Sequence, residues 1–179
     1  MPPECIARRV EIAREPDAAR RRPAGNRESM KIRFVEYGGP EWKAARILRH
    51  SVFYRESGLP ESVMDDGQEV RGSHLVALDS GAVVGYGRLN DLGDGLFNIS
   101  HMAVAPEYRG KGVGRMLLEG LVKAARSAKA EWIRLSARLP AVSFYERAGF
   151  HRAGETFGSA QAGLQYVEMK LKLIDDADK

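Results

Sequence analysis

A basic, glycine-rich loop joins an apolar strand to a helix near the middle of the chain. The strand covers residues 99–105, Pro106 ends it, and the helix begins at the glycines that follow. Glycine lets backbone N–H groups approach an anion, and a helix N-terminus carries a partial positive charge. Arg109, Lys111 and Arg115 add formal charge to the same loop. The segment therefore predicts a binding site for a phosphorylated ligand.

The spacing of the glycines separates the common phosphate-binding loops. A dinucleotide-binding loop needs a third glycine three residues after the second, and counting from Gly112 that place is held by Arg115. A P-loop needs a lysine followed by Ser or Thr, whereas Lys111 is followed by glycine. Both of these nucleotide loops are disfavoured, and a glycine-rich turn with incidental basic residues stays open as an alternative.

Two segments resemble the signatures of the GNAT-type N-acetyltransferases. The first is Arg-x-x-Gly-x-Gly at residues 109–114, after a Val-x-Pro strand end, and it resembles the loop that holds the pyrophosphate of acetyl-CoA. The second is Ala-x-x-x-Tyr-Glu-x-x-Gly-Phe at residues 141–150, in the family's order and at its distance. At lower specificity the likeness extends over residues 31–173. A weaker match, around residues 49–56 and 84–89, resembles the bacterial ElaA-like branch.

The order of strands and helices favours a single α/β domain with a mixed, mostly antiparallel sheet. Turn residues at 79–81 and 92–95 join three strands without a helix between them, which predicts an antiparallel meander. The strand after the glycine-led helix should lie parallel to the last strand of the meander. The expected strands are 31–37, 73–78, 82–89, 96–105, 132–137, 150–156 and 164–173. The expected helices are 41–56, 112–129 and a short one that Pro140 opens and Gly149 closes. Residues 61–72 are expected to form a loop with a short helical turn.

The resemblance implies a GNAT-like sheet, flanked by helices, whose fourth and fifth strands splay apart so that the pantetheine arm of the coenzyme lies between them. The residues at the end of the fourth strand can equally be ordinary core residues. By resemblance, the residues expected to bind acetyl-CoA are Met102, Ala103, Val104, Arg109, Gly110, Lys111, Gly112, Val113, Gly114, Arg115 and Phe144.

Acetyl transfer needs an acid for the departing thiolate and a base for the attacking amine. Tyr145 matches the family tyrosine near the coenzyme sulfur and is the expected acid, the alternative being an aromatic ring that only packs beside Phe144. For the base, family positions fall on Asn98 and Ser100, neither of which is basic, and a water relayed by these two residues stays open as an alternative. His101 titrates near neutral pH but alternates to the opposite face of a regular strand, unless a bulge turns it inward.

Acceptor recognition is expected from Phe53, Glu69 and Arg88. Acidic residues of the loop, Asp65, Asp66 and Glu69, suit a cationic acceptor or simply face solvent, and Glu69 is also a candidate base. Arg88 suits an acidic group of the acceptor or forms a surface salt bridge. No spacing typical of metal ligands occurs, so no metal is expected.

Composition agrees with a soluble enzyme domain at residues 30–175. The chain has 179 residues, a formal net charge of +4 and a single cysteine, Cys5, which excludes an intrachain disulfide and favours the cytoplasm. Neither a membrane span nor a nucleic-acid-binding stripe is expected, and a homodimer is left open. Residues 1–29 carry seven arginines and little apolar periodicity, which predicts a disordered tail.

The sequence thus predicts an acetyl-CoA-dependent N-acetyltransferase acting on a primary amine of a small molecule or a protein. Two alternatives stay open. One is a non-catalytic acyl-CoA-binding sensor of the same fold, because the base is in doubt. The other is a nucleotide-binding enzyme whose loop imitates the acetyltransferase motif.

Overall fold

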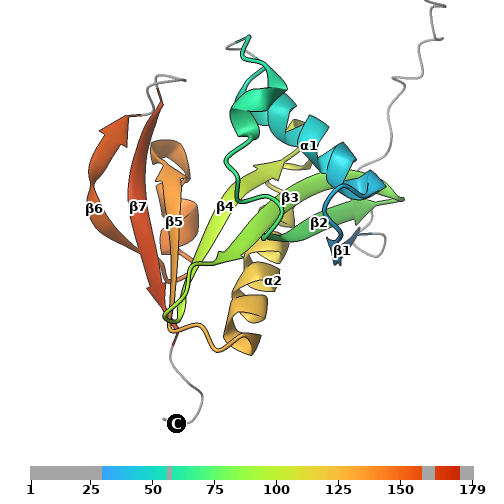
Figure 1. The fold of residues 1–179 in the computed structure, drawn as a ribbon. Coiled ribbons are helices and arrows are strands. Elements are labelled where there is room, and N and C mark those ends of the chain that lie inside the picture. The colour runs from blue at the N-terminus through green and yellow to red at the C-terminus, as the bar shows by residue number, and fades with distance from the viewer. Residues whose placement is uncertain (1–29, 56–57, 159–163, 174–179) are drawn as a thin grey trace, which may run out of the picture.

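Strands form one sheet in the order β1-β2-β3-β4-β5-β7-β6 (Figure 1). The computed structural model describes residues 30–55, 58–158 and 164–173, so the expected tail at 1–29 lies outside the described residues. The strands are β1 Met30–Val35, β2 Ser73–Asp79, β3 Ala82–Asp91, β4 Leu96–Val104, β5 Trp132–Arg138, β6 His151–Gly158 and β7 Gln165–Lys172. The helices are α1 Pro40–Phe53, α2 Val113–Ser127 and α3 Val142–Glu146, with 3-10 turns at Glu61–Met64, Pro106–Tyr108 and Leu139–Ala141.

The predicted mixed α/β sheet is confirmed. β1 to β4 pair antiparallel in chain order, and β4 pairs parallel with β5. The parallel pairing is short, because only Leu96–Asn98 of β4 is matched with Trp132–Arg134 of β5. Beyond these residues the two strands diverge, as Figure 1 shows. The splay expected between the fourth and fifth strands is therefore present.

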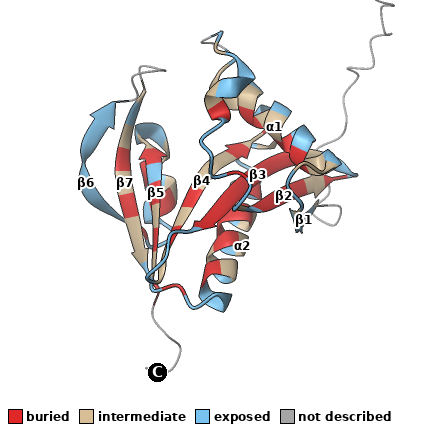
Figure 2. Ribbon diagram, in the orientation of Figure 1, coloured by how far each residue is buried: buried red, intermediate tan, exposed pale blue. Residues whose placement is uncertain are grey.

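Glycines let α2 pack closely against one face of the meander, while α1 covers the other (Figures 1 and 2). A Cβ added to Gly85 would lie 2.9 Å from Leu117, and one added to Gly87 would lie 2.7 Å from Leu121. Gly120 of the helix would similarly meet Leu75 at 2.8 Å. A side chain at any of these three positions would push α2 away from the sheet. The three glycines therefore set how closely the helix lies against the sheet.

The structure shifts the ends of several predicted elements by one to three residues and changes the buried side of α1. The first helix ends at Phe53 rather than at 56, and the last strand begins at Gln165 rather than at 164. Trp42 and Ala45 are buried as the apolar spacing predicts, but Arg49 between them and the helix end is completely buried as well. Among the described residues, no helix is both long enough and apolar enough to cross a membrane.

Candidate active site

The loop between β4 and α2 has the backbone geometry of an anion-binding site. Gly110 and Gly112 have φ of +73° and +87°, in the left-handed region that disfavours side chains. Gly112 is the N-cap of α2 and supplies no side-chain cap, so the first N–H groups of the helix are left for another acceptor. An anion placed here would accept those hydrogen bonds and meet the positive end of the helix dipole.

Basic side chains and one tyrosine hold this loop in place. The guanidinium of Arg109 reaches back to the end of β4, where its Nε lies 3.4 Å from the carbonyl oxygen of Val104. The ammonium group of Lys111 lies 5.3 Å from the centre of the Tyr108 ring. The hydroxyl of Tyr108 donates to Asp79 Oδ2 at 2.7 Å, which ties the loop to the end of β2. The loop is therefore anchored at both sides.

A bulge in β4 changes which side chains face the splayed gap. Tyr86 is paired with Ala103, but Arg88 is paired with Ser100, so β4 carries one more residue than β3 over this stretch. His101 lies in the bulge with φ of +55°. In a regular strand Ser100 and His101 would point to opposite faces, whereas here both line one cavity. The regular alternation does not hold at His101, because the bulge that the sequence leaves open as the exception is present.

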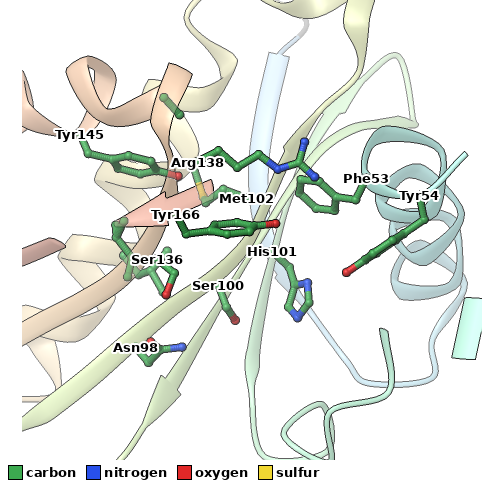
Figure 3. A pocket seen from close by; sticks show the side chains of 13 residues that line it. Phe53, Tyr54, Asn98, Ser100, His101, Met102, Ser136, Arg138, Tyr145 and Tyr166 are labelled. Carbon is green, nitrogen blue, oxygen red and sulfur yellow. The ribbon is translucent and has the colours of Figure 1, made fainter. Parts of the chain in front are cut away.

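The cavity lies where β4 and β5 separate and has a volume of about 260 Å³. Figure 3 shows the side chains that converge on it from the end of α1, from β4 and β5, and from α3 and β7. The lining consists of Phe53, Tyr54, Asn98, Ile99, Ser100, His101, Met102, Leu135, Ser136, Arg138, Ala141, Tyr145 and Tyr166.

Tyr145 of α3 enters this cavity from a packed aromatic group. Its ring lies 4.9 Å from that of Phe144 and 5.9 Å from that of Phe150, measured between ring centres. The ring is buried, and Figure 3 shows the hydroxyl directed toward the cavity. Burial raises the pKa of Tyr145 to about 12, so the hydroxyl keeps its proton at neutral pH.

A network of charged side chains lies directly behind the bulge. Arg88 of β3 is buried and pairs with Asp66 and with Glu69, whose Oε1 lies 3.3 Å from Arg88 Nη1. Arg88 also donates from Nε to Ser100 Oγ at 3.1 Å. From the other side, Arg49 Nη2 lies 2.6 Å from Glu69 Oε1. The expected salt bridge of Arg88 exists, but in the interior rather than at the surface.

The loop at 65–72 folds over β3 and buries these charges. His74 bridges the hydroxyl of Tyr86, at 2.7 Å, and the carbonyl oxygen of Glu69, at 2.9 Å. Asn90 donates to the carbonyl oxygen of Gln68 at 3.0 Å. Side chains of the sheet thus hold two carbonyl oxygens of the loop that carries Asp66 and Glu69, and Tyr86 holds His74 in place.

Asp66 connects the charged network to His101. His101 Nε2 lies 3.3 Å from Asp66 Oδ2. Burial alone would raise the pKa of Asp66, but hydrogen bonds from His101 and Arg88 outweigh it and hold that pKa well below its usual range. Burial lowers the pKa of His101 against the opposing effect of Asp66, with Arg49 and Arg88 also lowering it. These effects together favour the neutral imidazole over the charged form.

Ligand atoms of Asp66, Glu69 and His101 lie within 4.8 Å of one another, a grouping that resembles a metal site. Both carboxylates already pair with guanidinium groups, from Arg88 and Arg49. Because those cations balance the carboxylates, the donor set fits an ion-pair network better than a divalent cation.

The structure brings some of the predicted residues together and separates others. Asn98, Ser100, His101, Met102, Tyr145 and Phe53 share one cavity. Glu69 and Arg88 are buried behind it rather than lining it. Sequence reasoning missed Tyr54, Ser136, Arg138 and Tyr166, because the elements carrying them meet only in the folded chain. The sequence indicates Asp66 only as an acidic residue that could attract a cationic acceptor, whereas the structure places it against His101 and Arg88.

A second hollow, of about 580 Å³, lies between α2 and α3. Phe144 stands at one side of it, and an added Cβ at Gly114 would lie 3.6 Å from that ring. The other side is basic and includes Arg115, which pairs with Glu119 at 2.7 Å. This hollow adjoins the loop of the anion site through Gly114 and Arg115.

Comparisons with known proteins match this chain to acetyltransferases. Residues 51–173 match the family model described as the acetyltransferase (GNAT) domain. An uncharacterised N-acetyltransferase of Bacillus subtilis (strain 168), YjcF, is 31% identical over 127 residues, covering 71% of this chain and 89% of the relative.

Solved structures have the same fold. A candidate N-acetyltransferase of Lactobacillus plantarum has a TM-score of 0.72 at 26% identity, over 82% of this chain and 99% of that one. Escherichia coli ElaA has a TM-score of 0.67 at 20% identity, over 79% and 98% of the two chains. The likeness to ElaA shows the fold alone, so the ElaA-like branch stays a prediction.

Proposed function

The chain belongs to the GNAT family of acetyltransferases and is an acyltransferase, and we propose that it transfers the acetyl group of acetyl-CoA directly to a primary amine. The observation that carries the proposal is the meeting of a splayed strand pair, a buried tyrosine and a histidine at one cavity, with an anion-binding loop following the same strand β4. The acceptor is a small molecule or a protein amino group.

The loop and its surroundings suit the charges of the donor. Uncapped N–H groups at Gly112 and the charges of Arg109 and Lys111 fit a pyrophosphate. The basic hollow between α2 and α3 suits the phosphorylated nucleoside end of the donor. The gap between β4 and β5 would take the pantetheine arm against the backbone of residues 102–104, leaving the thioester at the cavity.

His101 is the proposed general base. Since a carboxylate only accepts hydrogen bonds, Asp66 fixes the proton of the imidazole on Nε2 and leaves Nδ1 as the nitrogen that accepts a proton from the amine. Asp66 is itself held by Arg88, so it acts as a positioning residue. The amine nitrogen then bonds to the thioester carbon as the carbon–sulfur bond breaks.

Tyr145 is proposed to stabilise the departing thiolate. With its pKa at about 12, the phenol holds its proton more tightly than a thiol of ordinary pKa near ~8.5. It therefore donates a hydrogen bond to the departing sulfur and keeps its own proton. The proton that His101 takes from the amine passes through solvent to the thiolate, so that CoA leaves as the neutral thiol. The motif predicts Tyr145 as the general acid, and the role proposed here is that of a hydrogen-bond donor to the departing sulfur.

Calorimetric titration with acetyl-CoA, CoA, ATP and NAD tests the donor. We expect acetyl-CoA and CoA to bind and ATP and NAD to bind at least about tenfold more weakly. Binding of ATP without binding of CoA would instead support a nucleotide-binding enzyme.

Replacing Tyr145 with phenylalanine should lower kcat about tenfold or more, which corresponds to about 1.4 kcal/mol of barrier, because the thiolate loses its hydrogen-bond donor. The affinity for acetyl-CoA should change little. The assay follows release of the CoA thiol, and Tyr37→Phe, at an exposed tyrosine outside the cavity, is the control. Unchanged turnover would exclude Tyr145 from the reaction.

Replacing Asp66 with asparagine should move the acid limb of the kcat/KM profile to lower pH. This limb reports the pKa of the free base, and burial lowers the pKa of His101, the proposed base, from its usual value of about 6.5. Asp66 raises the pKa of His101 while Arg49 and Arg88 lower it, so loss of the carboxylate lowers it further. The rate on the plateau should also fall, because the imidazole loses its fixed orientation.

The matched control for this profile is Asp65→Asn. The neighbouring carboxylate of Asp65 pairs with Arg46 at 2.7 Å rather than with His101. An acid limb that stays in place in Asp66→Asn, or moves to higher pH, would exclude His101 as the base.

A further inference from the structure

Loop carboxylates near the cavity already have cationic partners. Asp65 pairs with Arg46, and Asp66 pairs with Arg88. Glu69 lies between Arg49 and Arg88 and is buried. These carboxylates are therefore occupied, and they do not form an acidic surface that would attract a cationic acceptor.

The lining of the cavity is positively charged. None of its thirteen residues is an Asp or a Glu, and its permanently charged member is Arg138 at the end of β5. The guanidinium carbon lies 4.8 Å from the centre of the Phe53 ring. Across residues 30–55, 58–158 and 164–173, no carboxylate pairs with Arg138.

The surroundings of Arg138 restrict what can reach it. Figure 3 shows its guanidinium beside the ring of Phe53, with the ring of Tyr166 in the middle of the group of side chains. Arg138 is partly buried, so an anion that pairs with it is less screened by water than at a fully exposed arginine. Its planar fork of N–H donors matches the two oxygens of a carboxylate.

We propose that the acceptor is a small primary amine that carries a carboxylate at its other end, and that Arg138 binds this carboxylate while the amine faces His101. The proposal rests on the proposed function and names the substrate class of that site. The rings of Phe53, Tyr54 and Tyr166, which line the cavity, favour an aromatic or apolar spacer between the two ends of the acceptor.

The test compares para-aminomethylbenzoate with its methyl ester, which have the same amine and differ in the charge at the other end. Binding of each to protein saturated with CoA is measured by calorimetry, and acetylation of each is measured by release of the CoA thiol. We expect the acid to bind about tenfold or more tightly than the ester and to have the higher kcat/KM.

Arg138→Gln should remove this preference, whereas Arg138→Lys should keep part of it. The matched control is Arg134→Gln on the same face of β5, outside the cavity lining, which should retain the wild-type ratio. Acetyl-CoA affinity is measured for each variant and should stay unchanged.

Equal or undetectable binding of acid and ester by the wild-type protein would overturn the proposal. A preference that survives in Arg138→Gln would overturn it too, as would weaker acetyl-CoA binding in that variant, which would assign Arg138 to the donor. Failure of the wild-type protein to bind any CoA ligand would instead contradict the proposed function.

Discussion

Replacing Gly112 with valine is expected to reduce acetyl-CoA affinity by at least about 100-fold, or about 2.7 kcal/mol. Gly112 has φ of +87° and an added Cβ has open space around it, so the side chain itself would not clash with the protein. It would instead occupy the position of the phosphate. The phosphate could then no longer accept hydrogen bonds from the uncapped N–H groups of α2. Losing two charge-assisted hydrogen bonds at about 1.5 kcal/mol each accounts for the size of the effect.

The control for this variant separates backbone strain from the loss of the anion site. Gly93, in the turn before β4, has nearly the same φ of +88° and also has open space around an added Cβ. Gly93→Val should therefore destabilise the protein to a similar extent while leaving acetyl-CoA affinity unchanged. If Gly112→Val binds acetyl-CoA as well as the wild-type protein does, the loop is only a turn.

Replacing Glu69 with alanine is expected to lower the free energy of unfolding by about 3–5 kcal/mol. Arg49 is 0% exposed and Arg88 is 2% exposed, and both guanidinium groups lie against the Glu69 carboxylate. Without it, Arg49 would be a buried charge beside the ring of Tyr86 with its compensating carboxylate removed. Urea unfolding followed by circular dichroism measures the change.

An exposed ion pair gives the comparison for Glu69. Glu119 pairs with Arg115 on the surface of α2, so Glu119→Ala should change stability by about 0.5 kcal/mol or less. Should Glu69→Ala fail to fold, Glu69→Gln still tests the account, because its amide oxygen accepts a hydrogen bond from Arg88 but provides no charge. A loss below about 1 kcal/mol in both Glu69 variants would show that the buried network is not needed for stability.

The sequence predicts the donor side of the site better than the acceptor side. Gly112, Lys111 and Tyr145 belong to local motifs whose spacing is visible along the chain, and the fold that places them follows from turn residues and apolar periodicity. The order of β2 to β5 also follows from local signals, because hairpin turns join β2 to β3 and β3 to β4, and one helix, α2, joins β4 to β5.

The acceptor side depends on contacts between segments far apart in the chain. His101 faces the cavity because one extra residue in β4 breaks the alternation of the strand, and no turn or glycine marks that bulge in the sequence. Arg88 has the charge of a surface residue, yet a loop from residues 65–72 covers it and supplies its partners. Arg138 meets Phe53 only when the end of β5 reaches the end of α1.

The central claim is that acetyl passes from acetyl-CoA to an amine in this cavity. It is tested most directly by incubating the purified protein with acetyl-CoA labelled in the acetyl group and a panel of primary amines, and following the label by mass spectrometry. We predict that the label appears on the amine nitrogen, with one CoA thiol released for each amide formed. Tight binding of acetyl-CoA with no labelled amide and no thiol release would contradict this account and identify a sensor of acyl-CoA instead.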